Sequence, residues 1–270
     1  MKMSERIAVV GNSTSESQKI VKQLSEMLSV AGYQLTEQAP ELVITVGGDG
    51  TLLKGMHLYE TQLDAVRFVG VHTGHLGFYT DFTNDQLSEL LSALPNENPE
   101  KATRYPLLKV TVTCHDGRVT EHLALNESII RTRVKTLVAD VSISGEFFER
   151  FRGDGLSVAT PSGSTAYNKS VGGAVMHPAV AAMQMAEVAS LNNIVFRTLG
   201  APIIIAKKDT LTIVPASGND YVLTIDQFAL DFSDIAEIRY EMSGETIAFA
   251  NLNRSHFWKR VRHAFIEGNN

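Results

Sequence analysis

The chain has 270 residues, of which 44% are hydrophobic and 20% are charged, and this length predicts one or two domains with cores of their own. The net charge of −6 and the pI of about 5.8 argue against a general nucleic-acid binder. No apolar run approaches the roughly 18 residues of a membrane span, and the start, MKMSERIAVVG, is too short in apolar residues for a signal peptide. Cys114 is the only cysteine, so no internal disulfide can form. We therefore expect a soluble, cytoplasmic protein that binds neither nucleic acid nor membrane.

The first hundred residues alternate strand and helix signals. Three short apolar runs are typical of buried strands: Arg6–Gly11, Leu42–Val46 and Arg67–Val71. Apolar residues at helical spacing run from Ser15 to Val30, and Gly32 follows as a stop signal. A second helix is expected with Leu87 and Leu90 on its apolar face and Asn84 as its cap. This alternation predicts a mostly parallel sheet with helices on its faces.

The character of the sequence changes after a polar stretch, NENP, that begins at Asn96. Beyond it, alternating or short apolar runs predict strands at residues 108–114, 137–143, 211–214, 221–225 and 235–240. One helix is expected among them near Pro178–Leu191, where alanines surround two methionines, and the tail at Phe257–Ile266 is again helix-like. We expect an α/β domain over residues 1–103, a β-rich domain over 104–249 and a C-terminal segment over 250–270.

The segment Gly47-Gly48-Asp49-Gly50-Thr51 directly follows the second apolar run. Its glycines allow positive φ angles and close approach of the backbone to a ligand. If Thr51 opens a helix, the free N–H groups there favour phosphate. Asp49 would then stand beside bound phosphates, where it could orient a hydroxyl or help to hold Mg²⁺. The alternative is an ordinary Gly-Asp-Gly turn, but the abrupt end of a buried strand favours a site.

A second Gly-Asp-Gly, at residues 153–155, is followed by a block rich in hydroxyl groups, PSGSTAYNKS, at residues 161–170. This block nearly matches a P-loop, but Asn168 stands where the second glycine belongs, so we reject that interpretation. Tyr167 could instead offer a flat face to a nucleoside, with Ser162 and Thr165 as hydrogen-bonding partners. The alternative is a polar cap at the start of a helix.

Two other polar pairs are ambiguous from the sequence. Asn126 and Glu127 end an apolar stretch, where they could enter a cleft or form a simple strand-end turn. His72 and His75 have a spacing that could suggest a metal site, but no HExxH or Cys/His set accompanies them. A structural or phosphate-side role is favoured for these two histidines.

Taken together, these segments resemble the NAD kinase family. GGDGT at 47–51, NESII at 126–130, GDGLSVATPSGSTAYNKSVGGA at 153–174 and HPAV at 177–180 stand in the family's order and spacing. The resemblance covers essentially the whole chain and is greatest to the short enzymes of Gram-positive bacteria. GGDG alone is less specific, because lipid kinases and 6-phosphofructokinases share that loop. Lipid kinases lack the TPSGSTAYNKS block.

The resemblance implies an activity and an architecture. NAD kinases transfer the γ-phosphoryl group of ATP, or in some members polyphosphate, to the 2′-hydroxyl of the adenosine ribose of NAD, with Mg²⁺ or another divalent cation. The implied fold is an α/β domain plus a β-sandwich-like domain, with the site between them and a C-terminal segment that returns to the first domain. Subunits are expected to form homodimers or homotetramers with NAD sites near the subunit contacts.

The resemblance also implies roles for individual residues. Asp49 matches the proton acceptor, with Gly50 its neighbour in the NAD site, and Asn126 and Glu127 match the pair that contacts adenosine. The phosphate loop comprises Gly47, Gly48, Gly50 and Thr51. The other NAD-binding positions match Arg152, Asp154, Ser162, Thr165, Ala166, Tyr167, Asn168, Lys169, Ser170, Ala189 and Gln227, of which Ala189 and Gln227 fall on the nicotinamide side.

Two rival functions remain open at this point. One is a lipid or sugar kinase of the same GGDG-loop superfamily, against which the TPSGSTAYNKS block argues. The other is a non-catalytic NAD-binding module, against which the intact Asp49 argues.

Overall fold

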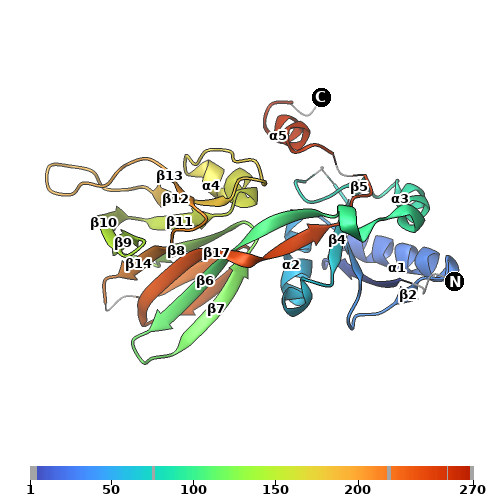
Figure 1. Ribbon diagram of the computed structural model, residues 1–270, viewed down its shortest axis with the longest axis horizontal. Coiled ribbons are helices and arrows are strands. Elements are labelled where there is room, and N and C mark those ends of the chain that lie inside the picture. Colours follow the sequence, from blue (N-terminus) through green and yellow to red (C-terminus); the bar gives the residue numbers. More distant parts are fainter. Residues whose placement is uncertain (1–4, 75–76, 218–219, 254, 268–270) are drawn as a thin grey trace. The chain divides into compact units, whose positions relative to one another are not determined.

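The computed structural model describes residues 5–74, 77–217, 220–253 and 255–267, and the chain divides into two units (Figure 1). The first unit combines Met1–Arg104 with Thr246–Asn270, and the second is Tyr105–Glu245. The chain passes between the units within two strands, β6 (Thr103–Cys114) and β17 (Ile235–Phe249). Among the helices described, none has the length and apolar character needed to cross a membrane.

The first unit is built on a parallel sheet in the order β2-β1-β3-β4. Its strands are β1 (Arg6–Gly11), β2 (Gln34–Leu35), β3 (Leu42–Val46) and β4 (Arg67–His72). The short strand β5 (Phe82–Thr83) and the last residues of β17 also pair with β4 in parallel. All five residues of β3 are buried, as expected for a central strand covered on both faces.

Helices complete the first unit. In α1 (Ser15–Val30) the cap Thr14 accepts a hydrogen bond from the Ser17 N–H, and Ile20, Leu24 and Leu28 enter the core on one face. The other helices are α2 (Asp49–Leu58), α3 (Leu87–Ala93) and α5 (Phe257–Phe265), with short 3-10 turns at Glu60–Gln62, Leu94–Asn96 and Pro99–Lys101. The α/β character predicted for the first domain is confirmed, and α5, from the C-terminal segment, belongs to this unit.

Two expected helix starts were wrong. Helix α2 begins at Asp49 rather than Thr51, because Gly48 is extended and serves as the N-cap. Helix α3 begins after Gln86 rather than at an Asn84 cap. The Gln86 side-chain oxygen accepts the Thr83 N–H at 3.0 Å, so Gln86 itself closes the turn before the helix.

The second unit consists of two antiparallel sheets. One has the order β13-β12-β11-β8-β15-β16, and the other follows β10-β9-β14-β17, with β6 beside β17 and β7 beside β6. The strands are β7 (Val119–Ala124), β8 (Glu127–Thr132), β9 (Leu137–Ile143), β10 (Glu146–Gly153), β11 (Gly155–Ala159), β12 (Ala182–Val188), β13 (Ile203–Ala206), β14 (Leu211–Pro215), β15 (Tyr221–Ile225) and β16 (Phe228–Phe232). After β11 come a 3-10 turn, η4 (Ser162–Thr165), and one helical turn, α4 (Tyr167–Ser170).

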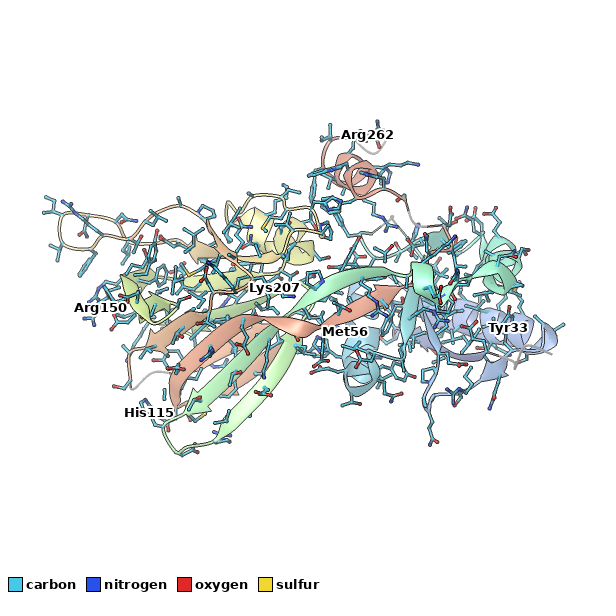
Figure 2. All side chains as sticks on the ribbon, viewed as in Figure 1. Tyr33, Met56, His115, Arg150, Lys207 and Arg262 are labelled. Carbon is cyan, nitrogen blue, oxygen red and sulfur yellow. The ribbon has the colours of Figure 1, made fainter. Side chains whose placement is uncertain are left out.

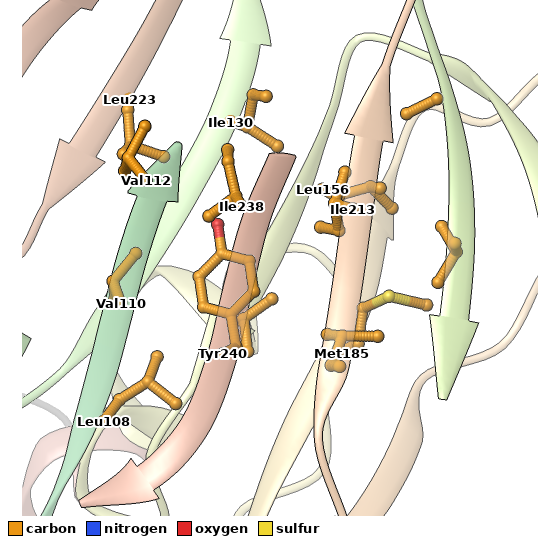
Figure 3. Packing of buried hydrophobic residues seen from close by; sticks show 14 of the residues in the cluster. Leu108, Val110, Val112, Ile130, Leu156, Met185, Ile213, Leu223, Ile238 and Tyr240 are labelled. Carbon is orange, nitrogen blue, oxygen red and sulfur yellow. The ribbon is translucent and has the colours of Figure 1, made fainter. Parts of the chain in front are cut away.

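One hydrophobic core joins the two sheets of the second unit. Figure 3 shows Leu108 and Val110 of β6 near Tyr240 of β17, with Leu156 and Met185 from the other sheet in the same cluster. The side-chain hydroxyl of Tyr240 lies 3.3 Å from the Ser128 hydroxyl, so this buried ring keeps a hydrogen bond. Shared packing of two sheet faces is the sandwich arrangement that was predicted.

The helix expected near Pro178–Leu191 is wrong, because this segment contains strand β12. It lies between β11 and β13, and residues 182–186 are all buried. Gln184 is also fully buried, and its side chain bonds the N–H of Ala174 at 2.8 Å and the carbonyl of Ala174 at 3.1 Å. Burial of both faces removes the alternation that would have revealed a strand.

Candidate active site

The glycine loop of the first unit begins where β3 ends. Gly47 has φ of +152°, and a Cβ there would lie 2.1 Å from the Thr51 hydroxyl oxygen, so only glycine fits. The Asn12 side chain, from the turn after β1, donates to the same hydroxyl at 3.3 Å. Gly48 and Gly50 are exposed, while Gly47 and Thr51 are buried. The first N–H groups of α2 lack partners within the helix and can receive an anion there.

Asp49 is the first residue of α2, and backbone N–H groups fix its carboxylate. The Phe78 N–H donates to Oδ2 at 2.9 Å and the Tyr79 N–H donates to Oδ1 at 2.9 Å. Each oxygen of a carboxylate can accept more than one hydrogen bond. Asp49 can therefore accept another hydrogen from a ligand without giving up these two.

Gly77 lets the backbone come this close to the carboxylate. A Cβ on Gly77 would lie 2.2 Å from Oδ1 of Asp49, a contact that no side chain can make. The Gly77 N–H in turn donates to the Thr80 hydroxyl at 3.0 Å, which closes the turn around the carboxylate. His75, one of the two histidines considered above, lies outside the described residues, and His72 is buried at the end of β4.

In the second unit, most of the predicted binding residues gather at one end of the six-stranded sheet. Glu127 pairs with Ala159 and Ser128 pairs with Ile225, so the start of β8 lies beside the ends of β11 and β15. A Cβ on Gly163 would lie 2.0 Å from the Asn126 carbonyl oxygen, so η4 packs directly on Asn126. We call this set the adenosine group, after the implied role of its first two members; it contains Asn126, Glu127, Ser162, Thr165, Ala166, Tyr167, Asn168, Lys169, Ser170 and Gln227.

Within the adenosine group, burial separates two kinds of residue. Asn126, Glu127, Ser162, Thr165 and Asn168 are buried, and both side-chain polar atoms of Asn168 lack a hydrogen-bond partner in the described part of the chain. Ala166 and Tyr167 are half-buried, while Lys169, Ser170 and Gln227 are exposed. The buried members shape the site, and the others are open to a ligand.

Glu127 has unusual electrostatics for a carboxyl group. Burial and the nearby Asp226 carboxylate raise the pKa of Glu127 to about 8, although a hydrogen bond from the Tyr167 backbone opposes the shift. One of its oxygens, Oε2, has no hydrogen-bond partner among the described residues. At pH 7 this carboxyl is therefore mostly protonated and can donate a hydrogen bond to a ligand.

Asp226 organises the adenosine group, and sequence reasoning missed it. Its carboxylate accepts the Asn126 N–H at 2.7 Å and the Leu125 N–H at 3.1 Å, and its own N–H donates to the Glu127 carbonyl. With φ of +51° it starts the two-residue turn between β15 and β16 that also carries Gln227. The turn could have been predicted from the apolar runs on either side, but its partners could not.

Asp154 and Ala189 lie at the opposite end of the six-stranded sheet, whereas Arg152 lies on β10 of the other sheet, where its carbonyl accepts the Leu191 N–H. We call these three residues the second group. Gly155, next to Asp154, pairs with Arg131 and Val188, the far ends of β8 and β12. The Asp154 N–H donates to the Val188 carbonyl, and the Arg152 guanidinium lies 4.3 Å from the ring centre of Phe196. Since β11 has five residues, about 13 Å of strand separates this second group from the adenosine group.

The described residues contain no group of three or more His, Cys, Asp or Glu side chains placed to hold a metal ion. Mg²⁺ in nucleotide-dependent enzymes is usually bound by substrate phosphates with one or two carboxylates. The side chains present thus fit a cation that arrives with a nucleotide, and they do not fit a cation held by protein ligands alone.

Comparison with known proteins gives the same family for both halves of the chain. The profile described as "ATP-NAD kinase N-terminal domain" matches residues 2–98, and that described as "ATP-NAD kinase C-terminal domain" matches residues 125–251. The NAD kinase of Lactococcus lactis subsp. cremoris (strain SK11) is 54% identical over 266 residues, covering 98% of each chain. That of Enterococcus faecalis (strain ATCC 700802 / V583) is 51% identical over 262 residues, covering 97% of this chain and 98% of its own.

Two solved structures have a similar fold. A yeast NADH kinase complexed with NADH aligns with a TM-score of 0.83 at 18% identity, covering 100% of this chain and 90% of its own. An NAD kinase from Archaeoglobus fulgidus in complex with ATP aligns with a TM-score of 0.73 at 25% identity, covering 96% of this chain and 99% of its own.

Proposed function

The chain belongs to the NAD kinase family, and we propose from this that it transfers the γ-phosphoryl group of ATP to the 2′-hydroxyl of the adenosine ribose of NAD, with Asp49 as the proton acceptor. It is an NAD kinase enzyme rather than the lipid or sugar kinase that the GGDG loop alone would allow. The observation that carries the role of Asp49 is its carboxylate, fixed by two backbone N–H groups at the first turn of α2.

In this proposal the glycine loop and Asp49 act on the reacting groups. The ribose 2′-oxygen forms a bond to the γ-phosphorus as the bond from that phosphorus to the β-phosphate oxygen breaks, and ADP leaves. Such transfers depend mainly on alignment and on stabilisation of phosphate charge, which the N–H groups at the start of α2 would supply. A carboxylate is a weak base toward a ribose hydroxyl, so the proton passes to Asp49 late, as the new bond forms.

The adenosine group would hold the acceptor substrate. Tyr167 offers its ring, the Asn126 side chain offers donors and an acceptor, and the protonated carboxyl of Glu127 offers one O–H donor. The donors and acceptors of an adenosine can pair with such a set, and stacking of the adenine on the Tyr167 ring would add affinity. Gln227, at the exposed turn after β15, would contact the nicotinamide side.

We also propose that a divalent cation, Mg²⁺ in the simplest case, enters with the ATP phosphates. When bound, it would neutralise charge on the β- and γ-phosphates. Whether polyphosphate can replace ATP depends on how the glycine loop binds a chain of phosphates without a nucleoside, and the assay below includes it. A cytoplasmic location belongs to the same proposal and rests on the use of a single, buried cysteine, Cys114.

A homodimer or homotetramer is the last part of the proposal. Large apolar side chains are exposed near the second group, on β10 and in the segment between β12 and β13: Phe147, Phe148, Leu191, Ile194, Val195 and Leu199. The Leu199 N–H donates to Glu149 of β10 at 2.8 Å, so these two elements are tied together. An apolar surface of this kind commonly marks a subunit contact.

The test is an assay of the purified protein with NAD, ATP and Mg²⁺, in which NADP is detected and phosphorus NMR identifies a 2′-monoester. Parallel reactions contain polyphosphate in place of ATP, or EDTA in excess over Mg²⁺, and the EDTA reaction should give no product. The decisive control is NAD that lacks the 2′-hydroxyl of its adenosine ribose. This analogue should bind but not be phosphorylated, because an error of about 1 Å in placement can cost roughly 10²-fold in rate. Phosphorylation of the analogue at another hydroxyl at a comparable rate would contradict the placement of the 2′-oxygen.

A further inference from the structure

Arg260, in the second turn of α5, is a buried cation in the first unit. Its relative exposure is 3%, and the carboxylate of Asp81, which it pairs with, is also buried. Its Nη1 donates to the carbonyls of Phe78 and Thr80, each at 2.8 Å, and lies 3.4 Å from the carbonyl of Gly77. A guanidinium with this many fixed partners holds a backbone segment in one geometry.

The segment held by Arg260 is the one that binds the catalytic carboxylate. In the peptide group between Phe78 and Tyr79, the carbonyl accepts from Arg260 and the N–H donates to Oδ1 of Asp49. In the peptide group between Gly77 and Phe78, the carbonyl faces Arg260 at 3.4 Å and the N–H donates to Oδ2 of Asp49. Two peptide groups thus connect the guanidinium on one side to the carboxylate on the other.

Aromatic packing supports the same segment from α5 and β17. The Phe78 ring lies 5.7 Å from the ring of Phe265 and 6.3 Å from that of Phe257, measured between centroids. The Tyr79 ring stacks on Phe249 at 5.8 Å with an angle of 6°. The segment therefore has little freedom as long as α5 is in place.

We propose that Arg260 is a positioning residue for phosphoryl transfer: through these two peptide groups it sets the orientation of the Asp49 carboxylate and strengthens the N–H bonds that hold it. A carbonyl that accepts from a cation makes the N–H of the same peptide group a stronger donor. The inference rests on the proposed role of Asp49. It assigns to helix α5 a part in turnover, although Arg260 is 180 residues from Thr80 in the sequence.

The first experiment compares Arg260→Lys and Arg260→Gln with Arg262→Gln, a matched control in the same helix. Arg262 is exposed and pairs only with Glu267 within the described residues, and Figure 2 labels it on α5. Lysine keeps the charge but cannot donate hydrogen bonds to Asp81 and to several carbonyls at the same time. We expect kcat to fall about 10-fold for Arg260→Lys and about 10²-fold for Arg260→Gln, as for small misplacements of a reacting group. The Kd for NAD should stay within about twofold in all three variants.

A merely structural role would give a different result. It would lower the melting temperature and leave the turnover of the folded fraction unchanged, or weaken NAD binding and kcat together. Either outcome in a folded Arg260→Gln protein would overturn the inference, as would wild-type kcat.

A double-mutant cycle tests whether Arg260 acts through Asp49. In the Asp49→Asn background, Arg260→Gln should cause no further loss of kcat, because the group it positions is already gone. A further loss of the same size as in the wild-type background would overturn the inference. The cycle also separates the two proposals. A wild-type kcat in Asp49→Asn would refute the role of Asp49. A low kcat in Asp49→Asn together with a wild-type kcat in Arg260→Gln would refute only the role of Arg260.

If Arg260→Gln does not fold at the assay temperature, Phe265→Ala takes its place. Phe265 is 42% exposed, so its removal is tolerable, yet it withdraws one of the rings that hold Phe78. We expect kcat to fall several-fold with NAD affinity unchanged, and Phe265→Leu to restore most of it. An unchanged kcat in Phe265→Ala would count against the inference.

Discussion

The carboxylate of Asp49 is held by hydrogen bonds from Phe78 and Tyr79, and each of its oxygens can still accept another hydrogen bond. In Asp49→Asn the side chain keeps its size but loses its charge and its ability to take a proton. We expect kcat to fall by about 10²–10⁴-fold, the usual contribution of a general base. Calorimetry should show an almost unchanged Kd for NAD. Near wild-type turnover would remove Asp49 from the chemistry.

Tyr167 has a ring that is half-exposed and lies 5.6 Å below the guanidinium of Arg131. If this ring stacks on adenine, Tyr167→Ala should weaken NAD binding by about 1–3 kcal/mol, the scale of stacking on an aromatic side chain. Arg131→Met is the control, because it removes the cation and leaves the ring. Unchanged affinity in Tyr167→Ala, measured by calorimetry, would mean that the ring only packs.

The raised pKa of Glu127 makes stability depend on pH in a predictable direction. The folded chain keeps this proton up to about pH 8, whereas the unfolded chain releases it near the ordinary value of about 4.3. Between these values the folded state binds more protons, so the free energy of unfolding falls as pH rises. In Glu127→Gln this contribution is absent. The stability of the variant relative to the wild type should increase from pH 5 to pH 8, by up to about 1.4 kcal/mol per pH unit.

Urea unfolding at several pH values measures the difference in the free energy of unfolding between Glu127→Gln and the wild type. The contributions of the other ionisable groups cancel in this comparison. A difference that is flat between pH 5 and pH 8 would show that Glu127 is ionised in the folded state.

At the scale of the elements, the turn after β4 depends on the lack of a side chain at Gly77. Gly77→Ala would place a methyl group 2.2 Å from Asp49, so the turn or the carboxylate must move. We expect a loss of kcat of about 10²-fold or more, as for a displaced reacting group. Gly74→Ala is the matched control, because a Cβ there meets nothing within 4 Å. Equal activity of the two variants in the NADP assay would contradict the close fit.

Strand β12 illustrates why some elements escaped prediction. Three of the parallel strands of the first unit, β1, β3 and β4, were predicted because each is a short apolar run between turn signals. The tail helix was predicted from its helix-like sequence. In β12, neighbours on both edges and both faces bury Gln184 as deeply as Met183 and Met185. A polar residue in a buried strand breaks the apolar run, and alanines favour a helix locally, so tertiary contacts decided the outcome.

In the candidate site, too, local sequence patterns predicted some residues, and tertiary contacts determined the others. Gly47 and Asp49 could be singled out because a glycine-rich turn at the abrupt end of a buried strand favours a ligand site over an ordinary turn. Asp226 and Arg260 act through backbone groups about 100 and 180 residues away, and no local pattern records such contacts. Local sequence patterns thus predicted the residues that would face a ligand, but they did not predict the residues that hold those side chains in place.

For the whole molecule, the position of Asp154 at the far end of the sheet from Asn126 gives a prediction about assembly. We expect the second group to serve a NAD molecule bound to another copy of the chain. Asn126→Ala and Asp154→Ala should each lose most activity, and a refolded mixture of the two should regain part of it. Mixed subunits can then contain one site in which both contributions are intact. Light scattering should give a dimer or tetramer for both variants.

No recovery in the mixture, with subunit exchange verified by differently tagged chains, would show that each copy binds NAD with its own residues alone. An active, strictly monomeric species would exclude the assembly altogether.

The division of the chain also has a consequence for its synthesis. The second unit is one continuous stretch, Tyr105–Glu245, whereas the first needs residues from both sides of it. The ribosome releases the chain from its N-terminus, and domains can fold as they emerge. The second unit can therefore fold before the C-terminal residues that complete the first unit have been synthesised. The turn around Asp49 receives Arg260 only after the whole second unit has been synthesised. The nascent chain should thus be able to fold its second unit before it can catalyse phosphoryl transfer.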